Sequence, residues 1–419
     1  MRKLMGLLVL IPFFAFGQGV SLDSLQSAAE KNWPSFKKRL SIAEENDLVI
    51  QILKRNYIPK VTVTGQATYQ SEVISFPEVQ IPGQAPLFPE LPFDNYAFEA
   101  NLTQILYDGG QIKAGRQIQE ASAEVQQKNV DVEVYDLKGK IQMLYLKYLL
   151  LEQTETILKL SISELDENLK IMQVGIDNGV LLEADKDHLT AQKIQILKQL
   201  ISLESGKKSI LKALSIMSGV ELSLAVQFEK PEVKSSADLV RPELQLLDAQ
   251  INLTATNMLK LNTVPIPKLV AFGKLGYGRP GFDMINTKMH GYYMVGAKFT
   301  WDIWGWNSLK KQKDQIYVKT NMIEHNKEML TKKIAIEHAE LQEEIDKYEK
   351  QIELSEEIEK LTENVYKTGQ SKFNNGTINS TEYLKLFNDL NRARLTTEAD
   401  KLGLLQAKLD WVHAQGVKK

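Results

Sequence analysis

The sequence predicts an α+β fold in which one unit of helix, strand, strand, helix and helix occurs twice. The first observation is an internal repeat, because Pro34 and Pro242 stand in similar contexts 208 positions apart. Three further pairs share this spacing: Pro59 with Pro267, Gly65 with Gly273, and Tyr69 with Tyr277. The second observation is that the apolar period changes within each copy from that of a helix to that of a strand. Two copies of one supersecondary unit restrict the fold more than any single motif does.

Later positions repeat with a spacing of 197. Leu102–Gly110 aligns with Phe299–Asn307 in this way, and Gly179 aligns with Gly376. One length change of 11 residues, placed between the two strands of each copy, accounts for both spacings, and a loop there can absorb it. We therefore assign 18–230 to the first repeat and 231–419 to the second.

The chain begins with the pattern of a secretory signal peptide over residues 1–17. Arg2 and Lys3 form a positive segment, Leu4–Phe16 is apolar, and Ala15-Phe16-Gly17 resembles a cleavage site, so the mature chain is expected to start at Gln18. A membrane anchor is the alternative, but the apolar stretch is shorter than the roughly 20 residues that a spanning helix needs.

Composition excludes several classes of protein. The 419 residues include no cysteine, so disulfides and a lipid attached to an N-terminal cysteine are excluded. A chain of this length can bury a core by packing alone. The net charge of −2 lacks the excess of basic residues that is typical of nucleic-acid-binding proteins.

In the first repeat, helical periodicity extends over Leu22–Arg55 and is interrupted at Trp33-Pro34, since proline breaks or kinks a helix. Alternating apolar and polar residues predict strands at about 61–70 and about 95–107. The segment between them, Phe76–Asp94, contains five prolines and is expected to be an irregular loop.

A run without proline from Gln111 to about Val174 predicts a helix of roughly 90–100 Å, which suggests a coiled coil or an extended bundle. A turn at Gly175–Gly179 and a returning helix at Leu181–Met217 follow. The second repeat is expected to contain the same elements: a helix at 242–261, strands at about 268–277 and 292–304, a long helix from 307 to about 368, a turn at 374–376 and a returning helix to about 413.

Each strand has one apolar and one polar face. In the last strand, Tyr293, Val295 and Phe299 alternate with polar residues such as Lys298. A soluble sheet packed on helices would show the same pattern, but these helices are too long for so small a sheet. Aromatic residues also gather at the strand ends, as in the girdles of outer-membrane barrels: Tyr69, Tyr96, Tyr107, Tyr277, Tyr292, Trp304 and Trp306. We therefore expect Leu102, Val295 and Phe299 on the outer face of a membrane barrel.

Four strands are too few to close a barrel, because the smallest barrels have about eight. Open sheet edges are not tolerated in lipid. The strands of several copies must therefore join, which predicts an oligomer whose shared barrel lies in the membrane while its helices project away.

The ordered motifs resemble those of the TolC-like outer-membrane efflux proteins, over nearly the whole mature chain. Asn32-Trp33-Pro34 and Arg241-Pro242-Glu243 each stand 25 residues before a Pro-Lys strand start. Leu106-Tyr107-Asp108-Gly109-Gly110 matches the strand-to-helix signature, and the turns at Gly179 and Gly376 complete the set. The second copy departs from this signature, with Ile303-Trp304-Gly305-Trp306-Asn307 in its place, so the geometry of that turn is open.

The resemblance implies a homotrimer in the outer membrane. Its three chains would form a 12-stranded β-barrel, with four strands per chain, continued by a long periplasmic α-helical barrel. It also implies a passive exit duct of a tripartite efflux or type I secretion system. A periplasmic adaptor (membrane fusion) protein would connect the duct to an inner-membrane pump, and the cargo (drug, metal ion or polypeptide) is left open.

Two sets of functional residues are expected in the helical region. The turns lie at the ends of the long helices, and we expect them to dock the adaptor; they contain Gly175, Asn178, Gly179, Asn374, Asn375 and Gly376. The resemblance places an acidic ring at the periplasmic aperture, on Asp185 and Glu382. The second acidic position is His188 in one copy and Lys385 in the other. Glu382 is equally consistent with complementing the dipole of its helix, and Lys385 is placed to pair with it.

No catalytic constellation is present, so neither an enzyme nor a cofactor is expected. The five histidines show no metal-ligand spacing: His188, His290, His325, His338 and His413. Gly206-Lys207-Lys208-Ser209 lacks the upstream glycine of a phosphate loop and lies in a helical run. Two other interpretations stay open. One is a structural or adhesive periplasmic coiled-coil protein, which would not need alternating strands with aromatic ends. The other is a periplasmic adaptor, which has a single helical hairpin and β-rich domains instead of this duplicated order.

Overall fold

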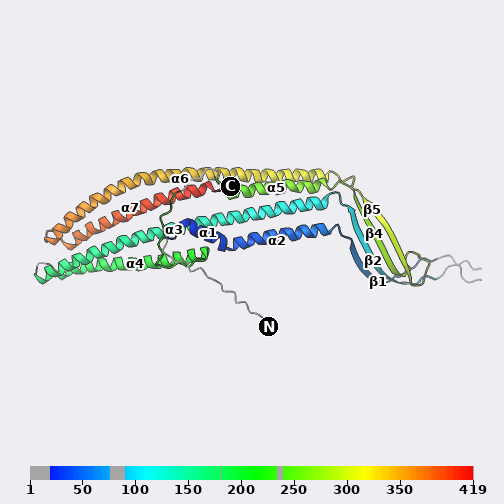
Figure 1. The fold of residues 1–419 in the computed structure, drawn as a ribbon, viewed down its shortest axis with the longest axis horizontal. Coiled ribbons are helices and arrows are strands. Elements are labelled where there is room, and N and C mark those ends of the chain that lie inside the picture. Colours follow the sequence, from blue (N-terminus) through cyan, green and yellow to red (C-terminus); the bar gives the residue numbers. More distant parts are fainter. Residues whose placement is uncertain (1–18, 76–89, 180, 234–238, 419) are drawn as a thin grey trace, which may run out of the picture. The chain divides into compact units, whose positions relative to one another are not determined.

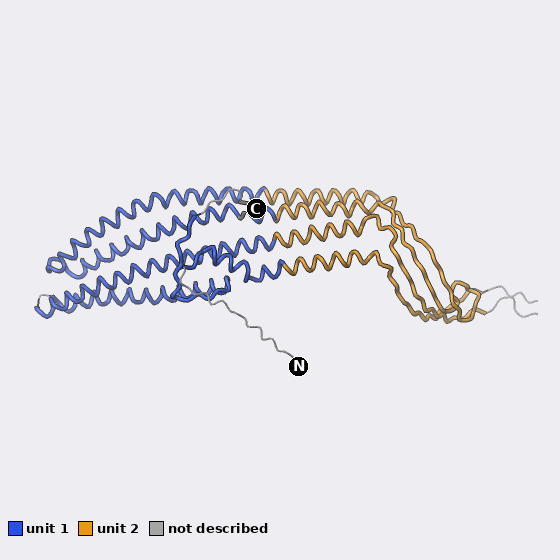
Figure 2. The backbone as a smooth tube through the Cα atoms, viewed as in Figure 1, with its two compact units in different colours: residues 1–39, 129–245, 328–419 blue, residues 40–128, 246–327 orange. Residues whose placement is uncertain are grey.

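The computed structural model describes residues 19–75, 90–179, 181–233 and 239–418. The chain divides into two compact units, and each takes segments from both repeats (Figure 2). Unit 1 comprises Met1–Arg39, Asn129–Gln245 and Glu328–Lys419, and unit 2 comprises Leu40–Lys128 and Leu246–Lys327. The expected signal peptide, 1–17, and most of the proline-rich segment lie outside the described residues.

Unit 2 contains one four-stranded antiparallel sheet (Figure 1). Its strands are β1 (Lys60–Tyr69), β2 (Asp94–Tyr107), β4 (Lys268–Arg279) and β5 (His290–Thr300). They lie in the order β1-β2-β4-β5, so the two hairpins of the duplicated unit meet where β2 pairs with β4. The strands β1 and β5 form the edges of this sheet, and each pairs with one neighbour only.

The register of the sheet aligns its apolar residues in rows. Val61 pairs with Leu102, which pairs with Gly273, which pairs with Val295. The next row on that face contains Val63, Ala100, Leu275 and Tyr293. Because side chains alternate along a strand, the residues between these rows belong to the opposite, polar face.

The strand β5 ends at Thr300, four residues earlier than the expected end at Trp304. Thr300 pairs with Lys268, the first residue of β4, and Pro267 before it has no N–H to offer a further ladder bond. The indole of Trp301 instead donates to the carbonyl oxygen of Pro265 at 3.0 Å.

The helices repeat with the same spacing as the sequence. The helices α3 (Gln111–Asp177) and α6 (Ser308–Asn374) both contain 67 residues, about 100 Å of straight helix. The helices α4 (Glu183–Ser218) and α7 (Ser380–Gln415) both contain 36. Before the strands lie α1 (Leu22–Asn32), α2 (Pro34–Arg55) and α5 (Pro242–Asn262), and the predicted break at Trp33-Pro34 is confirmed.

The two strand-to-helix turns share one backbone geometry despite their different sequences. Gly109 and Gly110 have φ of 68° and 87°, and Trp306 and Asn307, which align with them, have φ of 49° and 64°. In the first copy the carboxylate of Asp108 accepts the N–H groups of Gly110 and Ile112 at 2.9 and 2.6 Å. The second copy therefore keeps the turn without the glycines and without that carboxylate.

Unit 1 holds two separate apolar cores among its helices. One lies around Tyr145, whose ring stacks on Phe228 and whose hydroxyl donates to the carbonyl oxygen of Val20 at 2.7 Å. Nearby, two short strands, β3 (Leu239–Val240) and β6 (Val417–Lys418), join the connection between the repeats to the C-terminal end of the chain. The sequence pattern did not predict these two-residue strands.

The second core is formed by equal contributions from the two copies. Leu165 and Met172 of α3 and Leu189 of α4 pack with Tyr383 and Phe387 of α7, and residues of α6 complete the cluster. Among the helices of the described residues, none is both long and apolar enough to cross a membrane.

Candidate functional site: an apolar sheet face and two helical turns

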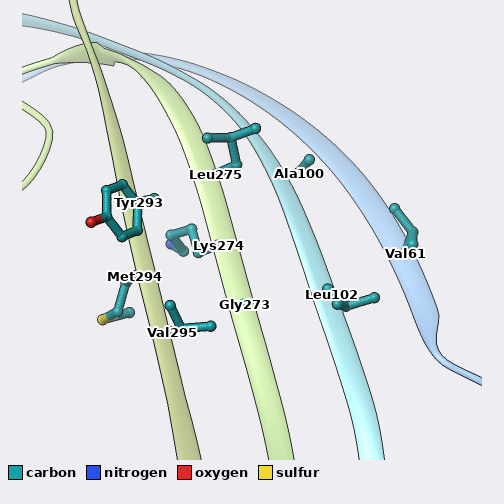
Figure 3. Close-up of a pocket in the computed structure, with 9 residues that line it drawn as sticks. All are labelled: Val61, Ala100, Leu102, Gly273, Lys274, Leu275, Tyr293, Met294 and Val295. Atoms are coloured by element: carbon teal, nitrogen blue, oxygen red, sulfur yellow. The ribbon is translucent and has the colours of Figure 1, made fainter.

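One face of the sheet in unit 2 presents apolar side chains from all four strands (Figure 3). Val61 of β1, Leu102 of β2 and Val295 of β5 lie in one row across the central Gly273. Val295 is 76% exposed and Phe299, further along β5, is 63% exposed. A band of this kind, continuous across a sheet, is typical of a surface that contacts a membrane or another protein.

The opposite face of the sheet has polar groups that satisfy one another. Lys274 Nζ lies 2.8 Å from Glu99 Oε2. The hydroxyl of Tyr292 donates to the other oxygen of the same carboxylate at 3.0 Å. Thr62, Thr64 and the rest of the even-numbered residues of β1 share this face with them. This face is the more polar of the two, although Val270, Phe272 and Met294 also belong to it.

The two turns of unit 1 are built alike. Gly179 and Gly376 have φ of 74° and 69°, the left-handed conformation that ends a helix and that residues with a Cβ adopt at a cost. Gly376 N–H donates to the carbonyl of Phe373 at 2.9 Å, and Thr377 N–H to that of Lys372 at 2.8 Å. A Cβ added at either glycine would meet no atom within 4 Å, so both turns are open on their outer side.

Of the six residues predicted for the helical turns, five are exposed: Asn178, Gly179, Asn374, Asn375 and Gly376. Gly175 differs from them because it lies inside α3 and is half-buried. A Cβ there would come within 2.7 Å of the side chain of Leu181, so Gly175 allows the returning chain to pack closely. Gly175 therefore packs against the returning chain, and the exposed surface of the turns belongs to the other five residues.

The two predicted aperture residues lie in different environments. The carboxylate of Asp185 accepts a hydrogen bond of 2.6 Å from Ser380, which joins the start of α4 to the start of α7. Glu382 is exposed, and its backbone N–H donates to the side chain of Asn379, the residue that caps α7. Within the described residues, no ion pair joins Glu382 to Lys385, although the helical spacing allows one.

A buried polar network lies beneath the turns. The hydroxyl of Tyr383 is 2.9 Å from that of Tyr366 and accepts a bond of 2.8 Å from the Asn168 side chain. Burial raises the pKa of Tyr383, so the hydroxyl stays protonated. These residues connect α3, α6 and α7, and sequence reasoning missed them because their polar atoms come from segments about 200 positions apart.

Metal-binding clusters of His, Cys, Asp and Glu are absent from the part of the chain that the structure describes. No protein-family profile matches the chain. No curated protein sequence matches it either.

Solved structures share the fold of the whole chain. The transmembrane channel CusC superposes with a TM-score of 0.72 at 12% identity, covering 96% of each chain. The outer membrane channel CmeC of Campylobacter jejuni gives 0.67 at 15% identity, over 94% of this chain and 85% of that one. The MtrE outer membrane channel of Neisseria gonorrhoeae, in its open state, gives 0.67 at 12%, over 94% and 88%.

These likenesses confirm the resemblance drawn from the sequence at the level of the fold. The chain has the fold of the TolC-like outer-membrane channels: mostly helical, with a small four-stranded antiparallel sheet. The solved structures compared above are outer-membrane or transmembrane channels.

Proposed function

We propose that this chain is one protomer of an outer-membrane exit duct. The observation that carries the proposal is the sheet of unit 2, which has one exposed apolar face across four strands and two edges without partner strands among the described residues. An apolar outer face and a hydrated inner face are what a membrane barrel requires. The fold shared with outer membrane channels supports the same function.

The edges of the sheet favour closure by further copies of the chain. All three strand pairings are antiparallel, so β1 and β5 run in opposite directions. When β5 of one protomer lies beside β1 of the next, that pairing is antiparallel as well, and the sheet continues without a change of pattern. Three protomers of four strands give a 12-stranded barrel, and lipid then meets no open edge.

In this proposal the barrel lies in the outer membrane and the long helices form a periplasmic barrel. Solutes pass through passively, because an inner-membrane pump supplies the energy through a periplasmic adaptor. The system is then of the tripartite efflux or type I secretion kind. An acidic aperture at Glu382 would attract cations, since three copies bring like charges together. Asp185 is already hydrogen-bonded to Ser380, so we expect a smaller contribution from it.

Conductance in planar bilayers tests the proposal. The purified, detergent-extracted chain should give stepwise currents, and a structural coiled-coil protein should give none. In the same recordings, Glu382→Gln should reduce cation selectivity more than Asp185→Asn does. Currents absent at all protein concentrations, with the oligomer intact, would contradict the exit duct.

Adaptor docking at the turns is tested by two substitutions at one position. Gly376→Asn keeps the left-handed conformation more readily than Gly376→Leu, because Asn tolerates it. If the turn only caps the helix, Asn should preserve both trimer stability and efflux. If the turn docks an adaptor, either side chain should lower efflux while Asn leaves the trimer stable. Full efflux by a stable Gly376→Leu trimer would count against docking there.

A further inference from the structure

Three lysines on the polar face of the sheet form no ion pair with an acidic residue in the described part of the chain. Lys60 begins β1, Lys268 begins β4, and Lys298 lies two residues before the end of β5. All three therefore lie near the end of the sheet at which its strands join the helices of unit 2. We call these three residues the lysine collar.

The register places the collar on the polar face. Lys60 pairs with Thr103, which pairs with Phe272. In the next two rows of the same face, Lys298 pairs with Val270 and Lys268 pairs with Thr300. Three successive rows of the polar face thus contain one collar lysine each. All three lysines alternate with apolar-face residues such as Val61 and Phe299, so a barrel with those residues in lipid has the collar in its lumen.

The charge of the collar is uncompensated among the strand residues of the described chain. The fourth lysine on this face, Lys274, forms an ion pair with Glu99 at 2.8 Å. Glu99 is the only acidic residue of that face within the four strands, and the next candidate, Asp302, lies two residues beyond β5. Within the described residues no ion pair or hydrogen bond involves the ammonium group of Lys60, Lys268 or Lys298.

We propose that the lysine collar makes the barrel lumen favour anions, so that it selects for solutes carrying negative charge. The inference rests on the proposed exit duct, in which three protomers place nine collar lysines around one lumen. Rings of Lys or Arg give a pore anion preference by raising the local concentration of anions. The effect reaches about 10 Å into the lumen at 0.1 M salt and about 30 Å at 0.01 M salt.

The collar also gives the duct two charge filters of opposite sign. Glu382 lies in unit 1 on the helical turns, and the collar lies in unit 2 on the sheet. A variant that changes only the collar therefore leaves the acidic aperture as it is. The difference in ion selectivity between variant and parent then measures the effect of the collar alone.

The reversal potential of the full chain in planar bilayers under a KCl gradient tests the inference. The charge-removing variant is Lys60→Gln, Lys268→Gln and Lys298→Gln together, and the matched control replaces the same three residues with Arg. The Gln variant should shift the chloride-to-potassium permeability ratio by about twofold or more towards potassium at low salt, and by less at high salt. The Arg control should keep the parent ratio.

The outcomes separate the inference from the function on which it rests. If the parent gives no currents, the exit duct itself fails, and the collar has no lumen to line. If the parent conducts and the Gln variant keeps the parent ratio at every salt concentration, the collar inference is overturned and the duct stands. If the triple variant does not assemble, Lys298→Gln alone decides in the same way, with a smaller expected shift.

Discussion

Trp306 and Asn307 hold a left-handed backbone that residues with side chains seldom adopt. Their φ values of 49° and 64° match those of Gly109 and Gly110 in the first copy. The hydrogen bond from Lys311 N–H to the Asn307 carbonyl, at 3.1 Å, also has its equivalent in the first copy. A non-glycine residue in this region costs about 1–2 kcal/mol. The surrounding turn therefore imposes this conformation against the preference of Trp306.

We expect Trp306→Gly to stabilise the protein in detergent by up to about 1 kcal/mol, because glycine adopts this backbone without strain. Trp306 is 86% exposed, so the change removes little packing. Thermal unfolding measures the effect. The control is Trp304→Gly, at a residue that is 76% exposed and has no positive φ, which should give no gain. Each of the two variants removes the edge-to-face contact between these indoles, so their difference isolates the backbone effect. A loss of stability for Trp306→Gly in detergent would show that the indole makes a contact that outweighs the strain.

His413 should make the stability of unit 1 depend on pH. Its ring stacks on Tyr135 with centroids 4.1 Å apart, and burial together with the charge of Arg241 lowers the pKa of His413. Glu337 and Glu243 act in the opposite direction without reversing the shift. A lowered pKa in the folded state means that the unfolded chain takes up the proton first. Stability is then present above about pH 6.5 and is lost as the pH falls below it.

His413→Gln removes this titration. The free energy of unfolding should therefore fall less for the variant than for the parent between about pH 8 and about pH 5.5. Chemical denaturation at the two pH values measures the free energy of unfolding of parent and variant. Burial also raises the pKa of Asp410, but this residue is present in both proteins, so it does not account for a difference between them. Equal pH dependence in parent and variant would show that His413 does not titrate differently on folding.

Adjacent residues of β5 belong to opposite faces of the sheet. Phe299 lies on the apolar face and Thr300 on the polar face. A membrane barrel makes an arginine on the lipid face costly, by about 2–4 kcal/mol at the bilayer midplane and by about 0–1 kcal/mol near the interfaces. Phe299 is the next-to-last residue of β5, so a cost towards the lower end of this range is expected there. Phe299→Arg should therefore lower the heat stability of the lipid-embedded oligomer, while Thr300→Arg should have little effect. The reverse result would mean that the register is wrong by one residue and that the faces are exchanged.

Most elements of this fold could be predicted from the sequence, because each has a strong period of its own. The helices α3 and α6 lack proline over their whole length, β1 alternates throughout, and β2 alternates up to Thr103. The strand β4 contains a continuous apolar run at Leu269–Phe272 and is identified by its place in the repeat. The end of β5 could not be predicted, since the alternation continues to Trp304 while the partner strand begins only at Lys268. The pair β3 and β6 was missed because two residues show no period.

At the scale of the whole molecule, turn positions were easier to predict than the contacts between helices. Gly179 and Gly376 identify the turns by themselves, since the left-handed ends of helices favour glycine. The hydrogen bond between Ser380 and Asp185 joins segments 195 positions apart, and no local sequence pattern predicts it. The proposed oligomer rests on a different kind of argument: among the described residues the sheet has two unpaired edges and one apolar face, and such a sheet would be incomplete in lipid.

In the proposed barrel, β1 of one protomer pairs with β5 of the next. The chain has no cysteine, so two introduced cysteines report this contact alone. Neighbouring strands share a face, so Thr64→Cys should crosslink between protomers with a polar-face cysteine on β5, either Met294→Cys or Lys298→Cys. Val295→Cys, on the apolar face, is the matched control.

Disulfide formation in native membranes, followed by non-reducing electrophoresis, measures this contact. We expect covalent trimers for at least one polar-face pair, dimers as partial products, and none of these species for Thr64→Cys with Val295→Cys. Monomers alone for every polar-face pair, with the protein present in the outer membrane, would contradict a barrel closed through β1 and β5.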